Sequence, residues 1–477
     1  MSAPHDEAPT VQAPAEPISF WRSVWQALRG EHHDYTSEHL PRAVLLLAVP
    51  MVLEMVMESL FAIADVFWVS RLGRDAVAIV GITESLMSLI YAVAIGVSIA
   101  AGAVVARRIG EKDPEGAAHA AGQVLLLGLL FSTAIGLVLG TFTPQILRFL
   151  GAGEPIVALG TNFTRIMLGG NVTVFMIFLI NAVFRGAGDA VIAMRTLWLA
   201  NALNIALGPC FIFGLGPFPE LGVTGAAVAT NIGRGIGVLY QLWHLTARQG
   251  RIRIHLRHLL PDRELLTTLT RMAGSGTAQM LISTTSWVGL IKILAVFGSS
   301  ALAGYTIAIR VVIFALMPAW GLANAGATLV GQNLGAGKPE RAEEAVWIAT
   351  RFNTFFIGLI GAIFVIFAGP IIGIFTHDPE VHAFGRQALW IISLAFPLYA
   401  AGMCFGNAFN GAGDTWTPTR LNFVCYWLGQ IPLAWLLANL GKLGPAGIFI
   451  SVPIAFSVFA FWAAFLFRRG EWKTKKV

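Results

Sequence analysis

The chain has 477 residues, of which 56% are hydrophobic and only 12% are charged, and its mean hydropathy is +0.71. Soluble domains carry about 25% charged residues, so this composition excludes an ordinary water-soluble protein. The net charge is +6, but the basic residues lie between apolar runs rather than in one patch. We therefore expect no nucleic-acid partner.

Residues 1–42 are predicted to form a cytoplasmic tail ahead of the first membrane span. The beginning of this tail is rich in Pro, Ala and Glu, a composition typical of disorder. Farther on, Ile18, Trp21, Trp25 and Leu28 recur on one helical face, which favours an amphipathic helix on the membrane surface. The alternative is a helix packed on neighbouring loops. Because a long polar tail precedes the first apolar run, we expect no cleavable signal peptide.

Apolar runs recur along the whole chain and predict an all-α integral membrane protein with about twelve transmembrane helices. They divide into an N-lobe, residues 43–245, and a C-lobe, residues 268–467. A cytoplasmic linker, residues 246–267, joins the lobes, and residues 468–477 form a basic tail. The predicted spans are 43–68, 78–101, 118–141, 160–184, 192–213, 221–245, 268–297, 301–325, 344–369, 385–409, 418–438 and 443–467.

The basic residues predict the orientation of these spans. If the N-terminus lies inside, the loops on that side collect Arg107, Arg108, an arginine-rich linker and the basic tail, whereas the opposite loops hold few basic residues. Cytoplasmic loops are enriched in Lys and Arg. We therefore expect a multi-pass protein of the inner (plasma) membrane, embedded in the lipid bilayer with both termini in the cytoplasm.

The two lobes contain the same sequence features at one constant offset. FRGAGD at Phe184–Asp189 returns as FNGAGD at Phe409–Asp414, and the glycine-rich segment that begins at Gly96 returns at Gly321. The offset is the same for both pairs, since 409 − 184 = 225 and 321 − 96 = 225. A shared offset indicates a duplicated unit, and many transporters build two lobes around a central path from such repeats.

Three acidic residues of the first span carry the main functional signal. Glu54, Glu58 and Asp65 are spaced by four and seven residues, which brings them to nearly the same angle on an α-helix. Carboxylates inside a membrane are costly and usually serve a function. A stripe of them can hold and release a proton or a cation, as ion coupling requires. Pro50 is predicted to bend the helix just before the stripe.

The alternative is that these acids are structural and pair with hydroxyls or with Arg165 and Arg234. At the offset of 225, the three acids are replaced by Gln279, Ser283 and Leu290. The ion site is therefore expected in the N-lobe alone.

The second repeat also exchanges an acid for basic residues. Glu84 of the second span becomes Ile309, and the C-lobe carries Lys292 and Arg310 within its predicted spans. We expect both cations to be buried, as partners of the acids or of each other.

No motif of an enzyme or of a nucleotide-driven pump occurs. The chain has no HExxH pattern, GxSxG elbow or P-loop, which disfavours an embedded enzyme. Cys210, Cys404 and Cys425 fall within predicted spans without metal or redox spacing, so they are interpreted as small apolar side chains. We expect neither enzymatic activity nor a cofactor.

Several segments together resemble the multidrug and toxic compound extrusion (MATE) family. They are the span from Pro50 to Asp65, FRGAGD, LNIALGPCFIFGLG at 203–216, GVTGAAVAT at 222–230 and LVGQNLGAGKPERA at 329–342. The resemblance covers residues 43 to 467 and implies two pseudo-symmetric six-helix bundles in a V, around a cavity that opens alternately to each side. It implies a secondary active antiporter that exports organic, often cationic, compounds in exchange for protons or sodium ions.

The resemblance also implies an ion site in the N-lobe. Carried over by position, this site falls on Asp65, Asn181, Asn204 and Thr230. The first three would hold a sodium ion if sodium is the coupling ion, and no other metal is expected.

The motifs are closer to the DinF-like bacterial and archaeal branch of the family than to the NorM-like branch. NorM-like members place acids in the seventh and tenth spans, where this chain has Ser283 and Tyr399. DinF-like members have a second aspartate four residues after the asparagine, where this chain has Gly208. Glu58 or Glu54 is then the candidate for the missing carboxylate, which favours protons over sodium.

Candidates for the substrate surface share aromatic or thioether side chains, which adapt to flat or cationic ligands. They are Met280, Trp287, Tyr305, Phe314 and Tyr399. Ordinary helix packing is the alternative for each of them.

Two other functions stay open. A flippase for a lipid-linked saccharide or another amphipathic lipid would favour a larger cavity lined by cations, and only Lys292 and Arg310 point to it. A membrane-embedded transferase lacks a polar loop with a metal or nucleophile motif. In the leading interpretation the substrates are small organic molecules and the protein is a monomer.

Overall fold

The computed structural model describes residues 20–31, 33–246 and 250–475, and within them the chain forms helices and turns without β-strands. Ile18 and the beginning of the predicted tail lie outside these residues. The helices of the N-lobe side are α1 (Phe20–Arg29), α2 (Leu40–Ser70), α3 (Arg74–Gly110), α4 (Pro114–Thr141), α5 (Thr143–Phe149), α6 (Glu154–Gly169), α7 (Asn171–Ala187), α8 (Ala190–Phe213) and α9 (Val223–Thr246).

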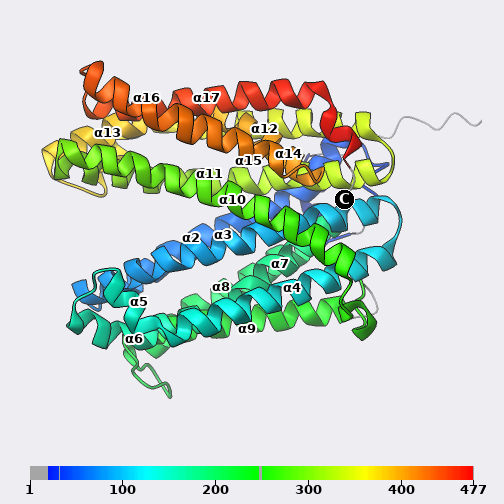
Figure 1. The fold of residues 1–477 in the computed structure, drawn as a ribbon, viewed down its shortest axis with the longest axis horizontal. Helices are drawn as coiled ribbons and strands as arrows, with labels where there is room; N and C mark the ends of the chain where they lie inside the picture. Colours follow the sequence, from blue (N-terminus) through cyan, green and yellow to red (C-terminus); the bar gives the residue numbers. More distant parts are fainter. Residues whose placement is uncertain (1–19, 32, 247–249, 476–477) are drawn as a thin grey trace, which may run out of the picture.

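The linker contains a short helix, η1 (Leu256–Leu259), and the C-lobe follows it. Its helices are α10 (Arg263–Leu294), η2 (Ala295–Phe297), α11 (Ser299–Gly335), α12 (Pro339–Gly373), α13 (Pro379–Ser393), α14 (Phe396–Gly411), α15 (Trp416–Asn422), η3 (Phe423–Gln430), α16 (Ile431–Trp435), η4 (Leu436–Leu440), α17 (Pro445–Arg469) and η5 (Glu471–Thr474). Figure 1 shows the two lobes apart at the left of the view and together at the right, where the C-terminus lies.

Most predicted spans correspond to helices that can cross a membrane. Among the described residues, ten helical segments are long and apolar enough, and the bent pair α13–α14 gives an eleventh. The remaining prediction, 221–245, corresponds to α9, a helix of 24 residues that packs along α8. It is less apolar because it carries Asn231, Arg234, Gln241 and several glycines. The all-helical, duplicated architecture is thus confirmed.

The fourth span of each repeat, predicted at 160–184 and 385–409, is interrupted at equivalent positions, although α6 and α7 together still form one span. α7 begins at Asn171 and α14 begins at Phe396, which are equivalent positions of the two repeats because 396 − 171 = 225. α13 and α14 meet at an angle of 54°. Hydropathy alone does not reveal these breaks, because both halves of each pair are apolar.

The first helix of each lobe packs against the opposite lobe. α2 lies on α11, and α10 lies on α3. Glycines let the backbones approach closely, since a side chain at Gly96 would collide with Thr277, and one at Gly321 would collide with Met51 and Val52. Gly96 and Gly321, and likewise Val52 and Thr277, are related by the offset of the repeats. The two crossings are therefore equivalent by pseudo-symmetry.

The two lobes contact each other directly at the end of the molecule where the C-terminus lies. A side chain at Gly110 of α3 would collide with the carbonyl of Gln332 in α11, and one at Gly335 would collide with the carbonyl of Arg107. Gln332 also donates its Nε2 to the Gly186 carbonyl oxygen at 2.9 Å, and Arg107 donates to a carbonyl of the C-terminal segment at 2.9 Å. These contacts close this end of the molecule.

Two predictions about the first part of the chain meet the structure only in part. α1 packs Ser23 and Ala27 against its neighbours and leaves Trp21 75% and Trp25 59% exposed, so it combines the packed and the surface-facing alternatives. α2 runs as one helix through Pro50. The helix is therefore continuous at Pro50, and a bend there stays a prediction.

Candidate functional site

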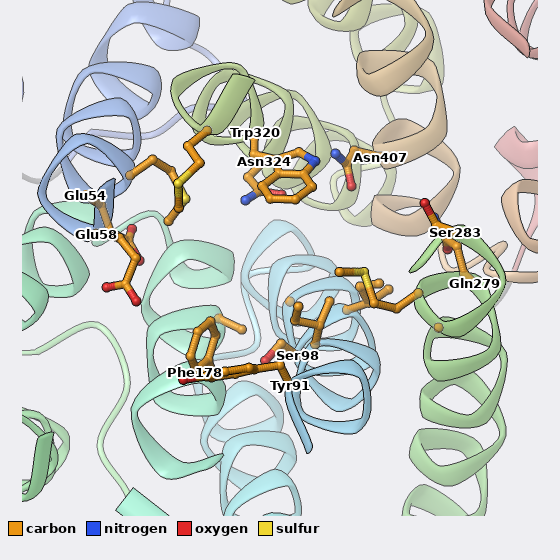
Figure 2. Close-up of a pocket in the computed structure, with 18 of the residues that line it drawn as sticks. Glu54, Glu58, Tyr91, Ser98, Phe178, Gln279, Ser283, Trp320, Asn324 and Asn407 are labelled. Atoms are coloured by element: carbon orange, nitrogen blue, oxygen red, sulfur yellow. The ribbon is translucent and has the colours of Figure 1, made fainter. Parts of the chain in front are cut away.

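A cavity of about 660 Å³ lies between the lobes and is lined by both. Figure 2 shows Glu54 and Glu58 of α2 on one side and Gln279 and Ser283 of α10 on the opposite side. These pairs occupy equivalent positions, because 279 − 54 and 283 − 58 both give the offset of the repeats. The duplication therefore places the acids and their neutral counterparts face to face across the cavity.

All charged residues of the cavity lining come from the N-lobe. The four acids are Glu54, Glu58, Asp65 and Glu84, and the two cations are Arg185 and Arg234. The C-lobe wall contributes polar but uncharged groups, among which Figure 2 shows Gln279, Ser283, Asn324 and Asn407. Four acids against two arginines leave a formal excess of two negative charges (4 − 2 = 2).

Glu54 lies at the centre of a buried polar network and is only 1% exposed. Its Oε1 accepts hydrogen bonds from Arg185 Nη1 at 2.7 Å and from Asn181 Nδ2 at 3.1 Å. Gln241 Nε2 donates to Asn181 Oδ1 at 2.5 Å. Glu54 Oε2 has no hydrogen-bond partner among the described residues. One oxygen of this carboxylate is therefore held by a cation, while the other is free to take a proton.

Glu58 belongs to a second network one helical turn farther along α2. Its Oε2 accepts from Asn201 Nδ2 at 2.9 Å, and its Oε1 lies 3.6 Å from Arg234 Nη2. Arg234 is 4% exposed and donates to the Tyr91 hydroxyl at 3.2 Å. Of the two arginines that we considered as structural partners of the acids, Arg234 therefore lies beside Glu58. Arg165 is exposed.

The residues that the family resemblance implies for the ion site do not form one hydrogen-bonded cluster. Asn204 Nδ2 donates to Thr230 Oγ1 at 2.7 Å, and Asn181 belongs to the Glu54 network. Asp65 lines the cavity and has neither a hydrogen bond nor an ion pair with any residue that the structure describes. In this conformation, Asp65, Asn181 and Asn204 therefore share no hydrogen bond with one another among the described residues.

The space around Gly208, where DinF-like members have a second aspartate, is not filled by other side chains. A side chain at Gly208 would meet only Trp68, at 3.9 Å. Neither candidate for the missing carboxylate fills this space, since Glu54 binds Arg185 and Glu58 binds Asn201.

Two of the five predicted substrate contacts line the cavity, namely Met280 and Tyr399. Trp287, Tyr305 and Phe314 do not. Tyr305 is 1% exposed and is stacked inside the C-lobe. These three were predicted from residue type alone, and helix packing accounts for the positions of Trp287 and Tyr305.

The expectation that Lys292 and Arg310 are buried is wrong, although Arg310 interacts electrostatically with the acid Glu84, which agrees with the alternative of a partner for the acids. Lys292 and Arg310 are both exposed, and neither lines the cavity. Their place within an apolar run says that they are near the membrane, but it does not say which side of the helix they occupy.

Sequence reasoning missed the partners of the acids, above all Arg185. A signal for it was present in the repeats, because FRGAGD and FNGAGD differ only at Arg185 and Asn410. Glu54 becomes Gln279 in the same repeat. An acid and a base that are lost together are typical of an ion pair. Asn201 and Gln241 carried no comparable signal.

Comparison with known proteins agrees with this geometry. A model described as MatE matches residues 50–210 and again residues 276–436, once in each lobe. The probable multidrug resistance protein YoeA of Bacillus subtilis is 26% identical over 91% of this chain and 95% of its own length. An FAD transporter of Shewanella oneidensis is 24% identical over 89% and 93% of the two chains.

A solved structure shows the same fold. It is a MOP superfamily transporter from Pyrococcus furiosus, described as having a binding pocket of reverse polarity, and it superposes with a TM-score of 0.86 at 27% identity. The match covers 93% of this chain and 98% of that one. With two family matches that span most of its length, the chain belongs to the MatE family of multi-pass membrane transporters, whose members are not enzymes.

Proposed function

We propose that the protein is a secondary active multidrug efflux antiporter that exports organic cations while protons or sodium ions enter. The charge of the cavity carries this proposal, because the lining has an excess of two acids (4 − 2 = 2) and no cation from the C-lobe. A cavity of this sign attracts cations and repels anions. The name of the relative YoeA, a probable multidrug resistance protein, supports multidrug efflux.

The rest of the lining suits flat organic molecules. Aromatic and thioether side chains from both lobes face the cavity, and they include Tyr91, Phe178, Met280, Trp320 and Tyr399. Aromatic faces attract cations, and methionine side chains adapt to ligands of different shape. Such a surface favours many substrates of one charge over a single substrate of fixed outline.

Coupling follows from competition for the same carboxylates. A cavity acid that gains a proton no longer attracts an organic cation, so proton entry and substrate release are linked. Asp65 suits this role because it lines the cavity and has no partner among the described residues. Asn204 and Thr230 offer oxygen atoms for a sodium ion instead, so sodium stays the alternative coupling ion.

We further propose that the closed end faces the cytoplasm and that both termini lie there. Arg107, Arg108 and the arginines of the linker lie toward this end, in agreement with the enrichment of cytoplasmic loops in basic residues. The cavity then opens to the outside in this conformation. The assignment to the DinF-like branch and the monomeric state stay predictions.

Ethidium efflux from vesicles tests the function. We expect export when a pH or a sodium gradient is imposed, and imposing the two gradients separately identifies the ion. Asp65→Asn is expected to abolish gradient-driven export, because an amide neither binds nor releases a proton. Asp75→Asn is the matched control, since Asp75 is an exposed acid at the start of α3. Normal export by Asp65→Asn would refute the coupling role.

The flippase alternative would favour a cavity lined by free cations. Both arginines of the lining have acidic neighbours, Arg185 with Glu54 and Arg234 with Glu58, and Lys292 and Arg310 lie outside the lining. Lipid scrambling in vesicles, with no ethidium export under either gradient, would overturn the antiporter proposal in its favour. Export of FAD, for which one relative is named, would overturn the predicted preference for cations.

A further inference from the structure

A second hollow lies outside the central cavity, on the flank of the C-lobe between α12 and α17. It is an open groove of about 690 Å³. Its lining consists of Trp347, Thr350, Arg351, Thr354, Phe355 and Arg468. None of these residues takes part in the networks around the acids.

The groove lies where the membrane ends. Arg351 is followed by a long uncharged run, 352–376, and Arg468 is preceded by another of the same length, 443–467. At about 1.5 Å per residue, each run is longer than the roughly 30 Å hydrocarbon core of a bilayer. Both arginines therefore stand at the headgroup level, on the side of the membrane where the C-terminus lies.

The two arginines are free to bind an anion. Both are exposed, and neither has a carboxylate partner among the described residues. Arg468 lies over the ring of Trp347 at 5.2 Å, which holds its guanidinium beside the groove. By contrast, the next residue, Arg469, forms an ion pair with Glu471 at 2.9 Å and does not line the groove. The positive charge of the groove thus comes from Arg351 and Arg468.

An exposed aromatic side chain extends the groove toward the apolar run. Thr350 adds no donor, because it is 6% exposed and its buried hydroxyl interacts with the Cys404 thiol. Phe355 is 77% exposed and lies one helical turn from Arg351 toward the apolar run. A headgroup phosphate would meet the arginines, while an acyl chain would lie along Phe355.

We propose that this groove binds an anionic phospholipid of the adjoining leaflet, with its phosphate between Arg351 and Arg468. Guanidinium groups bind phosphate oxygens through short, charge-assisted hydrogen bonds, and anionic headgroups attract basic residues at the membrane surface. The site is separate from the transport path, so the proposal does not depend on which substrate or ion the protein carries.

Native mass spectrometry of the purified full-length protein tests the site. The probe is phosphatidylglycerol, titrated against phosphatidylcholine of the same chain length. We expect affinity for one phosphatidylglycerol to fall about fivefold for each arginine removed, in R351Q and R468Q, and about thirtyfold in the double variant. R469Q removes the same charge from the same end, and it should bind like the wild type. R351K/R468K, which keeps both charges, should retain most of the binding.

Each contrary outcome overturns the proposal. Equal retention of phosphatidylglycerol by the wild type and by both single variants would show that the groove is not the site. Equal binding of phosphatidylcholine would show a lipid contact without charge selection. Displacement of phosphatidylglycerol by millimolar inorganic phosphate would show a site for a free anion. If the double variant does not fold, the single variants, compared with R469Q, decide the question.

Discussion

At the scale of single residues, one buried ion pair of the N-lobe is replaced as a whole in the C-lobe. Glu54 and Arg185 are 2.7 Å apart in the N-lobe, and their equivalents in the C-lobe are Gln279 and Asn410. A buried charge without a partner is strongly destabilising, whereas neutral side chains at both positions leave no unpaired charge. The C-lobe thus shows a neutral combination that this scaffold accepts.

Exchange of this pair tests the idea. Arg185→Asn should destabilise the protein by about 3 kcal/mol or more, because it leaves the buried Glu54 carboxylate without a cationic partner. Glu54→Gln should cost less, since the Arg185 side chain is 15% exposed and that of Glu54 only 1%. The double variant, which copies the C-lobe, should recover most of the loss. Thermal unfolding in detergent measures all three, and additive losses in the double variant would contradict the pairing.

At the scale of elements, the linker is a docked structural segment. Gln123 of α4 is fully buried and donates its Nε2 to the carbonyl oxygens of His258 and Leu260, at 2.8 and 2.7 Å. Its Oε1 accepts from the Asp262 backbone N–H at 3.0 Å. One side chain therefore satisfies three backbone groups of the linker and fixes the start of α10 on the N-lobe.

Removal of this side chain should loosen the linker. Gln123→Ala leaves buried backbone groups unpaired, which costs about 1–3 kcal/mol for each group that water does not reach. We expect a lower unfolding temperature and faster trypsin cleavage after the exposed Arg257. His119→Gln is the control, because the His119–Asp262 contact of 3.1 Å is partly exposed and such pairs contribute about 0–1 kcal/mol. Equal effects of both variants would argue against a special role of Gln123.

At the scale of the whole molecule, closure depends on small residues where the lobes meet. Gly110 and Gly335, which are equivalent positions of the two repeats, each lie against a backbone carbonyl of the other lobe. Two contacts related by the repeat thus seal one end. Their opening is the motion that would expose the cavity to the opposite side.

Gly335→Ala should shift the protein toward the state that is open at the C-terminal end. The added methyl group would collide with the Arg107 carbonyl oxygen. In a cysteine-free background, a cysteine in place of the cavity residue Asn324 should then react about tenfold faster with an impermeant maleimide applied from that end, a shift of about 1.4 kcal/mol. Gly274→Ala is the control, because a side chain there meets open space. Unchanged labelling would show that closure does not depend on this contact.

The sequence by itself determined the spans, the duplication and the lobe that carries the acids. Long apolar runs must form helices, because a backbone inside a bilayer has no water to bind. The offset of 225 then related Gly96 to Gly321, and the structure shows that both make equivalent crossings. The sequence also placed Glu54, Glu58 and Asp65 on one face of the first helix, and all three line the cavity.

Only the tertiary structure decided which side of each helix faces the cavity and which residues the acids bind. Transmembrane helices are apolar on all sides, so periodicity does not mark the inner face of α10 or α11. Tyr305 and Arg310 were placed wrongly for this reason. Glu54 and Arg185 are 131 residues apart in the chain. Contacts of that kind arise from the packing of whole helices, which the local pattern around either residue does not encode.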